Sequence, residues 1–376
     1  MRVQIVDPAA YTPPYDHALA GAVARAGADA ELITSRFPYG PVPQEDGYEV
    51  REVFYRRASR PGIGPPRRRL LRAAEHIPDM RRYRGVAESA DLVHYMWLPI
   101  PALDRRLLAP KRPRIYTMHW RLPESGTRIA RTLSRLLAEM DAVVVHSEHG
   151  AGRLQADFGV PPDRLRVIPH GAFDYLTRQE REVPLPEQLR ATESPVILAF
   201  GLIRPYKGID VLLEAFRRIE GAELWIAGMP RMPMDELREL AERAPGTVRF
   251  VDRFIPDTEI PAFMRRADIV VLPYRNIEQS GVLYTALAFG RPLVLSAVGG
   301  FPEIAEQGAA RLVPPGDADA LAAALRELLA DPSAREALGA AAAREAATTY
   351  SWDRIGQETV GLYRDLLGQP NADNPR

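Results

Sequence analysis

Two separated stretches of the sequence combine residue types that can bind a phosphorylated sugar. The first, "FGLIRPYKGIDVLLEAF" (200–216), places Arg204 and Lys207 three residues apart, just before an amphipathic helical pattern. Backbone N–H groups at a helix start, with two cations beside them, favour an anion such as phosphate. Gly201 ends the preceding strand pattern and lets the backbone turn closely. The stretch is not a Walker phosphate loop, because Tyr206 stands where that motif needs glycine, which argues against an ATPase.

The second stretch, "PYRNIEQSGVLYTALAFGRP", sets one carboxylate beside a turn that opens a helix predicted over 281–289. Glu278 is followed by Gln279, Ser280 and Gly281, and the amides of this turn predict a second anion site. A carboxylate repels phosphate but accepts hydrogen bonds from hydroxyl groups. The two stretches together predict a site for a sugar joined to a diphosphate.

Short apolar runs alternate with helical patterns along almost the whole chain. Continuous apolar strands separated by helices indicate parallel sheets covered on both faces, so the predicted fold class is α/β, doubly wound. In such sheets ligands bind beyond the carboxyl ends of the strands. The predicted strands are 3–6, 30–33, 91–96, 114–120, 141–147, 163–169, 195–201, 222–228, 247–252, 268–274, 292–297 and 310–315.

The length of 376 residues predicts two domains, and the charged, proline-punctuated stretch 177–195 is the best linker candidate. Helical patterns dominate from 317 onward. The predicted division is a first domain over 1–180, a linker over 181–194, a second domain over 195–350, a C-terminal helix over 351–368, and a disordered tail over 369–376.

The composition excludes several classes of protein. Forty-nine basic residues balance forty-nine acidic ones, which argues against nucleic acid as a partner. The absence of cysteine removes disulfides, a thiolate nucleophile and cysteine-ligated metals. The chain starts with a strand-like run rather than a leader, and no eighteen apolar residues run together. We expect a soluble, cytoplasmic protein.

Arginines gather between residues 56 and 84. A solvated face is the simplest interpretation. The alternatives are an anionic membrane surface, a phosphate-bearing substrate and nucleic acid, because clustered arginines attract anionic lipids by roughly 1 kcal/mol each. Peripheral contact with the inner membrane face is therefore an open expectation.

Histidines mark the first half of the chain. His94, His119 and His146 each close a predicted strand, and His170 lies where the chain leaves the first domain. Imidazoles in these places can be structural or catalytic. They can also bind zinc, but nothing fixes their spacing as in a local metal motif, so we expect no metal.

Several stretches resemble the family 4 retaining glycosyltransferases of the group 1 type. In the second half they are "FGLIRPYKGIDVLLEAF", "DIVVLPY", "SGVLYTALAFGRPLVLSAVGGFPEI" and "ARLVPPGDADALAAAL"; the first half matches more loosely through "VVVHSEHGAGRLQADFGVPPDRLRVIPHG". The resemblance implies the GT-B fold, in which two Rossmann-like domains face across a cleft, the first binding the acceptor and the second the nucleotide sugar. It also implies that the C-terminal helix over 351–368 packs back on the first domain.

The activity that the resemblance implies is hexosyl transfer with retention, without a metal or other cofactor. The donor would be a nucleotide diphosphate sugar, with UDP- or GDP-sugars favoured, and the acceptor a hydroxyl on a glycan, a lipid-linked glycan or a small molecule. Arg204 and Lys207 would stabilise the departing diphosphate, Glu278 would contact the donor sugar, and His119 would face sugar and acceptor. The further donor contacts implied are Gly201, Gln279, Ser280, Gly281, Val282, Thr285, Arg253 and Ile255.

The sequence departs from the family pattern in two places. Thr285 replaces a second glutamate that holds the ribose, which weakens ribose affinity by around 1 kcal/mol or more. A glycine-rich loop after the first strand is also absent. Tyr15, Asp16 and His17 of the stretch that replaces it are therefore candidates for the acceptor side. His94, His146 and His170 join them because of their places after strands and at the end of the first domain. Altered donor use, a hydrolase or phosphorylase activity, and a non-catalytic nucleotide-sugar-binding or scaffold protein are the rival interpretations.

Overall fold

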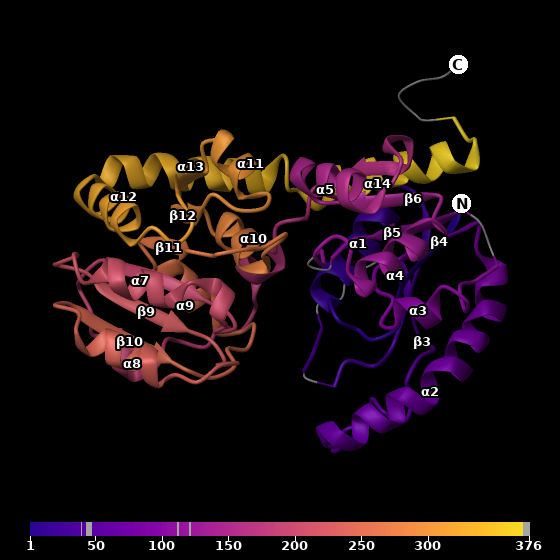
Figure 1. Cartoon of the computed structure of the whole chain (residues 1–376), viewed down its shortest axis with the longest axis horizontal. Helices are drawn as coiled ribbons and strands as arrows, with labels where there is room; N and C mark the ends of the chain where they lie inside the picture. Colours follow the sequence, from indigo (N-terminus) through magenta and orange to yellow (C-terminus); the bar gives the residue numbers. More distant parts are fainter. Residues whose placement is uncertain (39, 43–46, 111–112, 120–121, 371–376) are drawn as a thin grey trace. The chain divides into compact units, whose positions relative to one another are not determined.

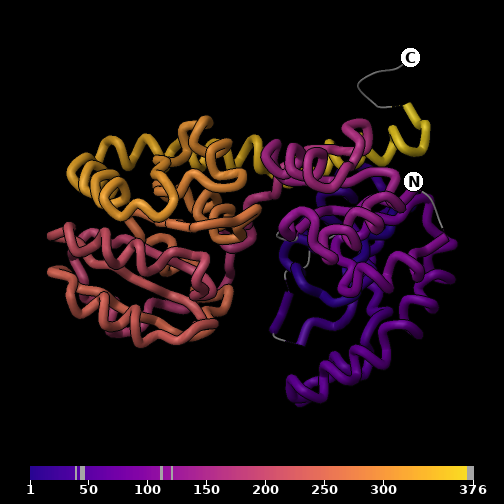
Figure 2. Tube along the Cα trace, in the orientation of Figure 1, coloured from indigo at the N-terminus to yellow at the C-terminus, as the bar shows by residue number. Residues whose placement is uncertain are grey.

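The computed structural model describes residues 1–38, 40–42, 47–110, 113–119 and 122–370, so most of the expected disordered tail lies outside the described residues. The chain forms two compact units. One comprises Met1–Gly171 together with Trp352–Arg376, and the other comprises Ala172–Ser351. Figure 1 labels the elements, and Figure 2 follows the chain by colour from the first unit through the second to the final helix.

The first unit is built on a parallel sheet of seven strands in the order β3-β2-β1-β4-β5-β6-β7. The strands are β1 (Arg2–Asp7), β2 (Asp29–Thr34), β3 (Tyr48–Glu52), β4 (Leu92–Tyr95), β5 (Arg114–Thr117), β6 (Ala142–Val145) and β7 (Leu165–Val167). Of these, β3 is missing from the sequence-based prediction. Its sequence YEVRE is charged and largely exposed, as suits a short edge strand.

Helices cover both faces of this sheet because its strands send alternate residues to opposite sides. Val3 and Ile5 of β1 belong to a core shared with α1 (Pro13–Arg25) and α14 (Trp352–Leu367), while Val6 belongs to a core on the other face. The remaining helices of the unit are α2 (Pro65–Val86), α3 (Pro101–Asp104), α4 (Arg128–Leu137) and α5 (Glu148–Phe158), with 3-10 turns at Ala87–Ser89 and Pro162–Arg164.

The second unit repeats this plan with a six-stranded parallel sheet in the order β10-β9-β8-β11-β12-β13. Its strands are β8 (Val196–Phe200), β9 (Glu223–Ala227), β10 (Thr247–Val251), β11 (Ile269–Leu272), β12 (Leu293–Ser296) and β13 (Ala310–Val313). Both units are therefore doubly wound and Rossmann-like, as the sequence predicts.

Two hydrophobic cores lie on the two faces of the second sheet, and again alternate strand residues divide between them. Val196 and Leu198 pack with α9, α10, α11 and α13, whereas Ile197 packs with α7, α8 and α12. The helices are α6 (Glu187–Arg190), α7 (Ile209–Phe216), α8 (Asp235–Glu242), α9 (Ile260–Arg266), α10 (Gly281–Ala288), α11 (Phe301–Glu306), α12 (Ala318–Ala330) and α13 (Pro332–Ala347), with 3-10 turns at Asp174–Arg178 and Pro205–Lys207.

The division between the units falls at Gly171 and Ala172, earlier than the expected domain end at 180. Residues of the expected linker 181–194 are packed into the second unit. The amide of Val183 donates to the carbonyl of Thr258 at 2.8 Å, and Leu189 is only 1% exposed. The charges and prolines that suggested a linker lie on the exposed side of a segment that the second core holds in place.

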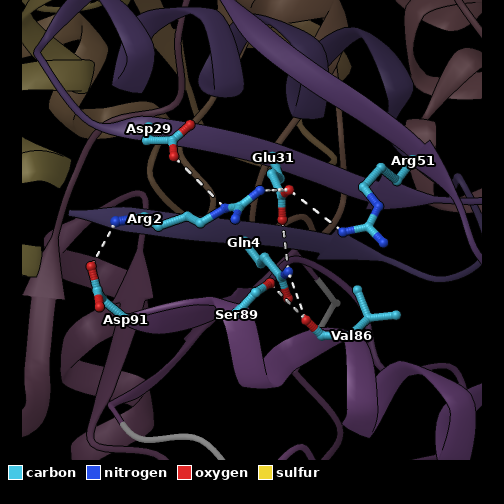
Figure 3. Close-up of polar contacts among 8 residues, drawn as sticks. All are labelled: Arg2, Gln4, Asp29, Glu31, Arg51, Val86, Ser89 and Asp91. Atoms are coloured by element: carbon cyan, nitrogen blue, oxygen red, sulfur yellow. Dashed lines mark hydrogen bonds and ion pairs between the residues drawn. The ribbon is translucent and has the colours of Figure 1, made fainter.

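A buried carboxylate ties three strands of the first unit together (Figure 3). Glu31 on β2 is 1% exposed and accepts hydrogen bonds from Arg2 at 2.5 Å and from Gln4 at 2.8 Å, both on β1. Arg51 on β3 lies 3.5 Å from the same carboxylate. A buried carboxylate is tolerated only when paired and hydrogen-bonded, so this group fixes the register of β1, β2 and β3.

The arginine-rich segment predicted between 56 and 84 is largely helical, because α2 takes up its second half. Among the described residues, no helix combines the length and apolar character needed to span a lipid bilayer.

Candidate functional site

Both stretches that the sequence singled out follow the central strands of the second sheet. β9 lies on one side of β8 and β11 on the other, so the strand order reverses between β8 and β11. In doubly wound sheets this switch point, at the carboxyl ends of the strands, is where ligands bind. The residues after Phe200 and after Leu272 therefore lie where a ligand of this unit is expected.

Lys207 is held at this switch point by close packing. Its side chain is 7% exposed, its Nζ donates to the carbonyl of Phe200 at 3.4 Å, and it lies 5.1 Å from the ring centroid of Tyr274. A Cβ at Gly201 would approach Val282 Cγ2 to 2.9 Å and Lys207 Nζ to 3.0 Å. The glycine thus lets the ammonium group, the end of β8 and the first turn of α10 come together.

The loops after β8 and β11 are locked to each other. Gly208 has φ of +63°, and a Cβ there would lie 2.0 Å from the carbonyl oxygen of Pro273. The amide of Arg275 donates to the carbonyl of Tyr206 at 2.8 Å. The Arg275 guanidinium also pairs with Asp210 in the first turn of α7, and this hydrogen bond holds the pKa of the Asp210 carboxyl below its ordinary value. Sequence reasoning missed this pair, although Arg275 stands within the quoted stretch.

Arg204 is exposed at the residue that precedes the turn Pro205–Lys207. In the part of the chain that the structure describes, its guanidinium group has no ion pair or hydrogen-bond partner. The Arg204 guanidinium, which lies on the same loop as Lys207, is therefore accessible to an anion.

At the start of α10 the side chains are engaged within the unit and the backbone is the open donor. The Gln279 side chain accepts a hydrogen bond from the Tyr284 hydroxyl at 2.6 Å. Thr285 is 6% exposed and its hydroxyl donates to the carbonyl of Gly281 at 2.9 Å. Ser280 is 6% exposed as the N-cap residue. The first amides of a helix have no partner inside it, so α10 offers N–H groups rather than side chains.

Glu278 is half-buried, and the chain around it is fixed by a close backbone contact. Gly299, which follows β12, has φ of +55°, and a Cβ there would lie 2.1 Å from the carbonyl oxygen of Ile277. Only glycine permits this approach, which holds the peptide before Glu278 against the neighbouring loop.

Arg253 and Ile255 follow β10, which β9 separates from β8. Arg253 makes a two-pronged contact with Glu259, at 3.1 and 2.6 Å, and Ile255 is 6% exposed within the core. Their side chains are thus used by the fold.

In the first unit the structure brings together a tyrosine and three of the predicted histidines, beyond the ends of β5, β6 and β7. The ring centroid of Tyr15 on α1 lies 4.6 Å from that of His119, 5.5 Å from His146 and 4.8 Å from His170. We call Tyr15, His119, His146 and His170 the histidine cluster. The described residues contain no group of three or more His, Asp or Glu side chains suited to hold a metal ion.

The hydrogen bonds of the histidine cluster define its tautomers. His146 Nδ1 lies 3.0 Å from the carbonyl oxygen of Ile168 and must donate to it, so its Nε2 carries the lone pair. His119 Nδ1 lies 3.4 Å from that Nε2 and can donate to it, which leaves the lone pair of His119 on Nε2. Within the described structure this buried Nε2 has no hydrogen-bond partner. Burial lowers the pKa of His146 to about 4, and lowers those of His119 and His170 well below the ordinary value, so these rings are neutral near pH 7.

Two other predicted acceptor residues are engaged by the fold instead. His94 lies inside β4 rather than after it, is 1% exposed, and its ring nitrogens lie 2.7 Å from the hydroxyls of Tyr363 and Thr117. His17 Nδ1 lies 2.6 Å from the Tyr48 hydroxyl. Both residues are therefore held by hydroxyl partners outside the histidine cluster, although His94 lies near enough to His146 to feel its charge. The predicted strand 91–96 already extended past His94, but the hydroxyl partners of its ring come from segments far apart in sequence.

Asp16 pairs with a carboxylate that sequence reasoning overlooked. Asp7 ends β1, is fully buried, and accepts hydrogen bonds from the amides of Ala9 at 3.0 Å and Thr12 at 3.3 Å. Burial and the neighbouring Asp7 raise the pKa of Asp16 well above its ordinary value, and burial also raises the pKa of Asp7. The proximity of the two buried carboxyls thus disfavours ionisation of both at once. The signal was the aspartate at the end of the first predicted strand.

Comparison with known proteins assigns both units to one family. The family model described as "Glycosyltransferase Family 4" matches residues 15–172, and the one described as "Glycosyl transferases group 1" matches residues 194–331. The fold, two Rossmann-like units each built on a parallel sheet, is that of the GT-B glycosyltransferases, and the two models give the family. The chain belongs to the family 4 glycosyltransferases of the group 1 type.

Curated relatives carry related names. The chain is 29% identical over 258 residues to the MMP alpha-(1->4)-mannosyltransferase of Mycolicibacterium hassiacum, covering 66% of this chain and 58% of that protein. It is 30% identical over 269 residues to the D-inositol 3-phosphate glycosyltransferase of Geodermatophilus obscurus, covering 68% of this chain and 59% of that protein. The matched region thus spans about three fifths of the length of these relatives.

Solved structures share the GT-B fold over nearly the whole chain. Sucrose-phosphate synthase from Thermosynechococcus elongatus has a TM-score of 0.73 at 22% identity, over 98% of this chain and 99% of that one. The Anabaena protein HepE, solved in complex with UDP-glucose, has a TM-score of 0.70 at 18% identity, over 97% of this chain and 100% of that one.

Proposed function

We propose that the chain transfers a hexosyl group from a nucleotide diphosphate sugar to an acceptor hydroxyl, with retention of configuration. The observation that carries this proposal is the meeting of Lys207, Gly201 and the first turn of α10 at the switch point of the second sheet. An ammonium group, open helix amides and the exposed Arg204 on one loop are the donors that a diphosphate needs.

The proposed chemistry breaks the bond between the sugar's anomeric carbon and the oxygen of the β-phosphate. The electron pair leaves with the diphosphate, and Lys207, Arg204 and the amides of Gly281 and Val282 neutralise the charge that develops there. The acceptor oxygen forms the new bond to the anomeric carbon from the same face, and its proton passes to the departing phosphate oxygen. Preorganised donors of this kind act where charge appears in the transition state.

Glu278 is proposed to accept hydrogen bonds from hydroxyls of the donor sugar. Its place beside the α10 amides suits this role, because a carboxylate accepts from hydroxyls and repels phosphate. The ribose contact proposed for Thr285 is confined to its hydroxyl oxygen as an acceptor, since the proton goes to the Gly281 carbonyl.

The donor base and the acceptor belong to this proposal as well. UDP- or GDP-sugars are favoured, and the names of the relatives support a hexose donor and a polyhydroxyl acceptor such as a sugar or inositol phosphate. On the acceptor side we assign the histidine cluster, where the lone pair on His119 Nε2 can accept a hydrogen bond from a hydroxyl.

Substitution of Lys207 tests the proposal directly. In Lys207→Ala we expect kcat to fall by about 10²–10³, because one preorganised donor to the developing charge is lost. The measurement is release of nucleoside diphosphate across a panel of UDP-, GDP- and ADP-sugars. Arg217→Ala is the matched control, since Arg217 follows α7 in the same unit, is exposed, and forms an ion pair with Glu214. Activity of Lys207→Ala within a few-fold of the wild type would end the assignment.

No metal is assigned to this reaction. Turnover is expected to stay unchanged after dialysis against EDTA, because cationic side chains and amides supply the charge that a metal ion would otherwise supply. A loss of turnover that Mg²⁺ or Mn²⁺ restores would contradict this expectation.

A change of donor use is the second candidate, because the buried Thr285 hydroxyl departs from the family's ribose contact. The panel of nucleotide sugars shows altered donor use directly, and the products separate the other rival interpretations. Nucleoside diphosphate released without acceptor indicates hydrolysis, whereas nucleotide-sugar binding without any turnover over a broad acceptor panel indicates a binding protein.

A further inference from the structure

Five arginines line one hollow on the surface of the first unit, and the proposed function uses none of them. The hollow has a volume of about 450 Å³ and lies between α4 and the segment that starts at α3. Its lining residues are Ala102, Arg105, Arg106, Arg128, Arg131, Thr132 and Arg135. This lining, which we call the arginine hollow, contains no carboxylate.

Helix α4 places three of these arginines in one row. Arg128, Arg131 and Arg135 are three and four residues apart, so they project from the same side of the helix. The opposite side is fixed in the core by Ala130, Leu133, Leu136 and Leu137. The N-cap Thr127 accepts a hydrogen bond from the amide of Ala130 at 3.1 Å and so fixes the start of the helix. Packing of α4 on the core therefore fixes the side on which the three arginines project.

The charges in the arginine hollow are mostly uncompensated. Arg105 pairs with Glu139 at 3.4 Å. Over the described ranges of the chain, Arg106, Arg128, Arg131 and Arg135 have no carboxylate within ion-pair distance, unlike arginines such as Arg253, which is paired. Like charges side by side repel, and a hollow with protein walls focuses their positive potential. An anion in the hollow would relieve that repulsion.

We propose that the arginine hollow binds the phosphate groups of a ligand with two or more phosphate charges. Planar guanidinium groups donate two parallel hydrogen bonds to phosphate oxygens, which is why arginine is suited to phosphate recognition. A hollow, in contrast to a flat basic face, takes a discrete group from either a soluble phosphorylated molecule or a lipid headgroup. This site belongs to the first unit and does not rest on the donor site of the second.

Titration calorimetry with pyrophosphate tests the proposal in the full-length protein. Pyrophosphate also suits the second unit, so the titration is done in the background Arg204→Gln/Lys207→Ala. In this background, one equivalent of pyrophosphate is expected to bind, in the arginine hollow. Adding Arg131→Gln/Arg135→Gln is expected to weaken this binding at least about tenfold, because each substitution removes hydrogen bonds to a charged group. Arg131→Lys/Arg135→Lys keeps the charge without the planar fork and is expected to fall between the two.

The matched control is Arg67→Gln/Arg69→Gln on α2, which removes the same charge from exposed positions of the same unit. It is expected to leave pyrophosphate affinity within about twofold, since neither residue lines the hollow. Equal losses of affinity in the α4 pair and the α2 pair would overturn the proposal, because they would show diffuse electrostatic attraction. The absence of any pyrophosphate binding would overturn it too. None of these positions in α4 and α2 is buried, and circular dichroism confirms that each variant is folded.

Vesicle sedimentation identifies the source of the phosphate. Phosphatidylcholine vesicles with and without phosphatidylglycerol are compared for the wild type and Arg131→Gln/Arg135→Gln. Pyrophosphate binding accompanied by vesicle binding that depends on these arginines assigns a lipid headgroup. Pyrophosphate binding without vesicle binding assigns a soluble ligand. Vesicle binding without pyrophosphate binding would overturn the hollow as a discrete site.

Discussion

Burial, more than the neighbouring imidazoles, lowers the pKa of His94 and of the three histidines in the histidine cluster. His94 is the clearest case, because it is almost completely enclosed by the fold. Burial, and to a lesser extent the neighbouring His146, lowers the pKa of His94 to about 3. Its two ring nitrogens meet the hydroxyls of Tyr363 and Thr117, which are neutral groups. Protonation of this ring therefore destabilises the folded state.

The stability of the first unit should consequently decline with acidification. An unfolded histidine takes up a proton near pH 6.5, whereas folded His94 does so only near pH 3. Between those values the unfolded chain binds more protons, so the free energy of unfolding falls as pH falls. His94→Gln should reduce the loss between pH 7 and pH 5 by about 2 kcal/mol. Urea unfolding at the two pH values measures this difference.

The control for this prediction is Tyr363→Phe, which keeps the buried imidazole but removes one hydroxyl from it. This variant is expected to lower stability at every pH and to keep the pH dependence of the wild type. A His94→Gln protein with the full wild-type pH dependence would show that other groups cause the decline.

Several residues of the candidate site could be predicted from the sequence, and the residues that were missed have a physical reason in common. Arg204, Lys207 and Glu278 were predicted from their types and from their place after strands, and the structure places all three in the two loops that follow β8 and β11. The partners of Asp16 and Arg275 were missed, because a side chain's partner depends on packing between segments far apart in sequence. His94 was assigned to the end of the predicted strand 91–96 although it lies inside it, because hydrophobic patterns locate strand ends only to within a few residues.

At the scale of elements, the second unit depends on a few close backbone contacts that only glycine allows. Gly208 starts α7 with φ of +63° and lies against the carbonyl of Pro273. This contact joins the loop carrying Lys207 to the loop that leads to α10. The two predicted anion-binding segments are thus held together by this backbone contact. The sequence alone does not show that the two segments touch.

Gly208→Ala is expected to weaken nucleoside diphosphate binding at least about tenfold. The new Cβ would lie 2.0 Å from the Pro273 oxygen, so the loops must separate and Lys207 must move. Gly221→Ala is the matched control, since Gly221 has φ of +71° and a Cβ there would meet nothing within 4 Å. This control carries the backbone strain without the clash and should bind within about twofold of wild type. Calorimetry with UDP and GDP measures both, and unchanged binding by a folded Gly208→Ala would contradict the coupling.

At the scale of the whole molecule, the first unit is assembled from both ends of the chain. α14 packs on α1 so closely that a Cβ at Gly356 would lie 2.4 Å from the carbonyl oxygen of Ala22. Alternating strands and helices predicted both sheets, but neither pattern shows that the core of the first unit contains residues from beyond 351. Whether a distant segment joins a core depends on tertiary packing. For α14, only the resemblance to the family suggested that it packs on the first unit.

Gly356→Ala should destabilise the first unit by about 2 kcal/mol and leave the second unaffected, because overpacking acts locally. Gly361→Ala on the same helix meets nothing within 4 Å and should stabilise the helix by up to about 1 kcal/mol. Hydrogen exchange followed by mass spectrometry reports on peptides of each unit separately. Equal acceleration of exchange in both units would contradict the local effect.

The discontinuous first unit also has a consequence for biosynthesis. A ribosome releases Met1–Gly171 first but must translate the whole of Ala172–Ser351 before α14 emerges. At roughly 5–20 residues per second, the face of the first sheet that α14 covers stays open for about ten to forty seconds. Within that interval the second unit, whose chain is continuous, can complete its fold. The nascent protein therefore completes its first unit last, and the apolar face that α14 covers stays exposed to solvent until then.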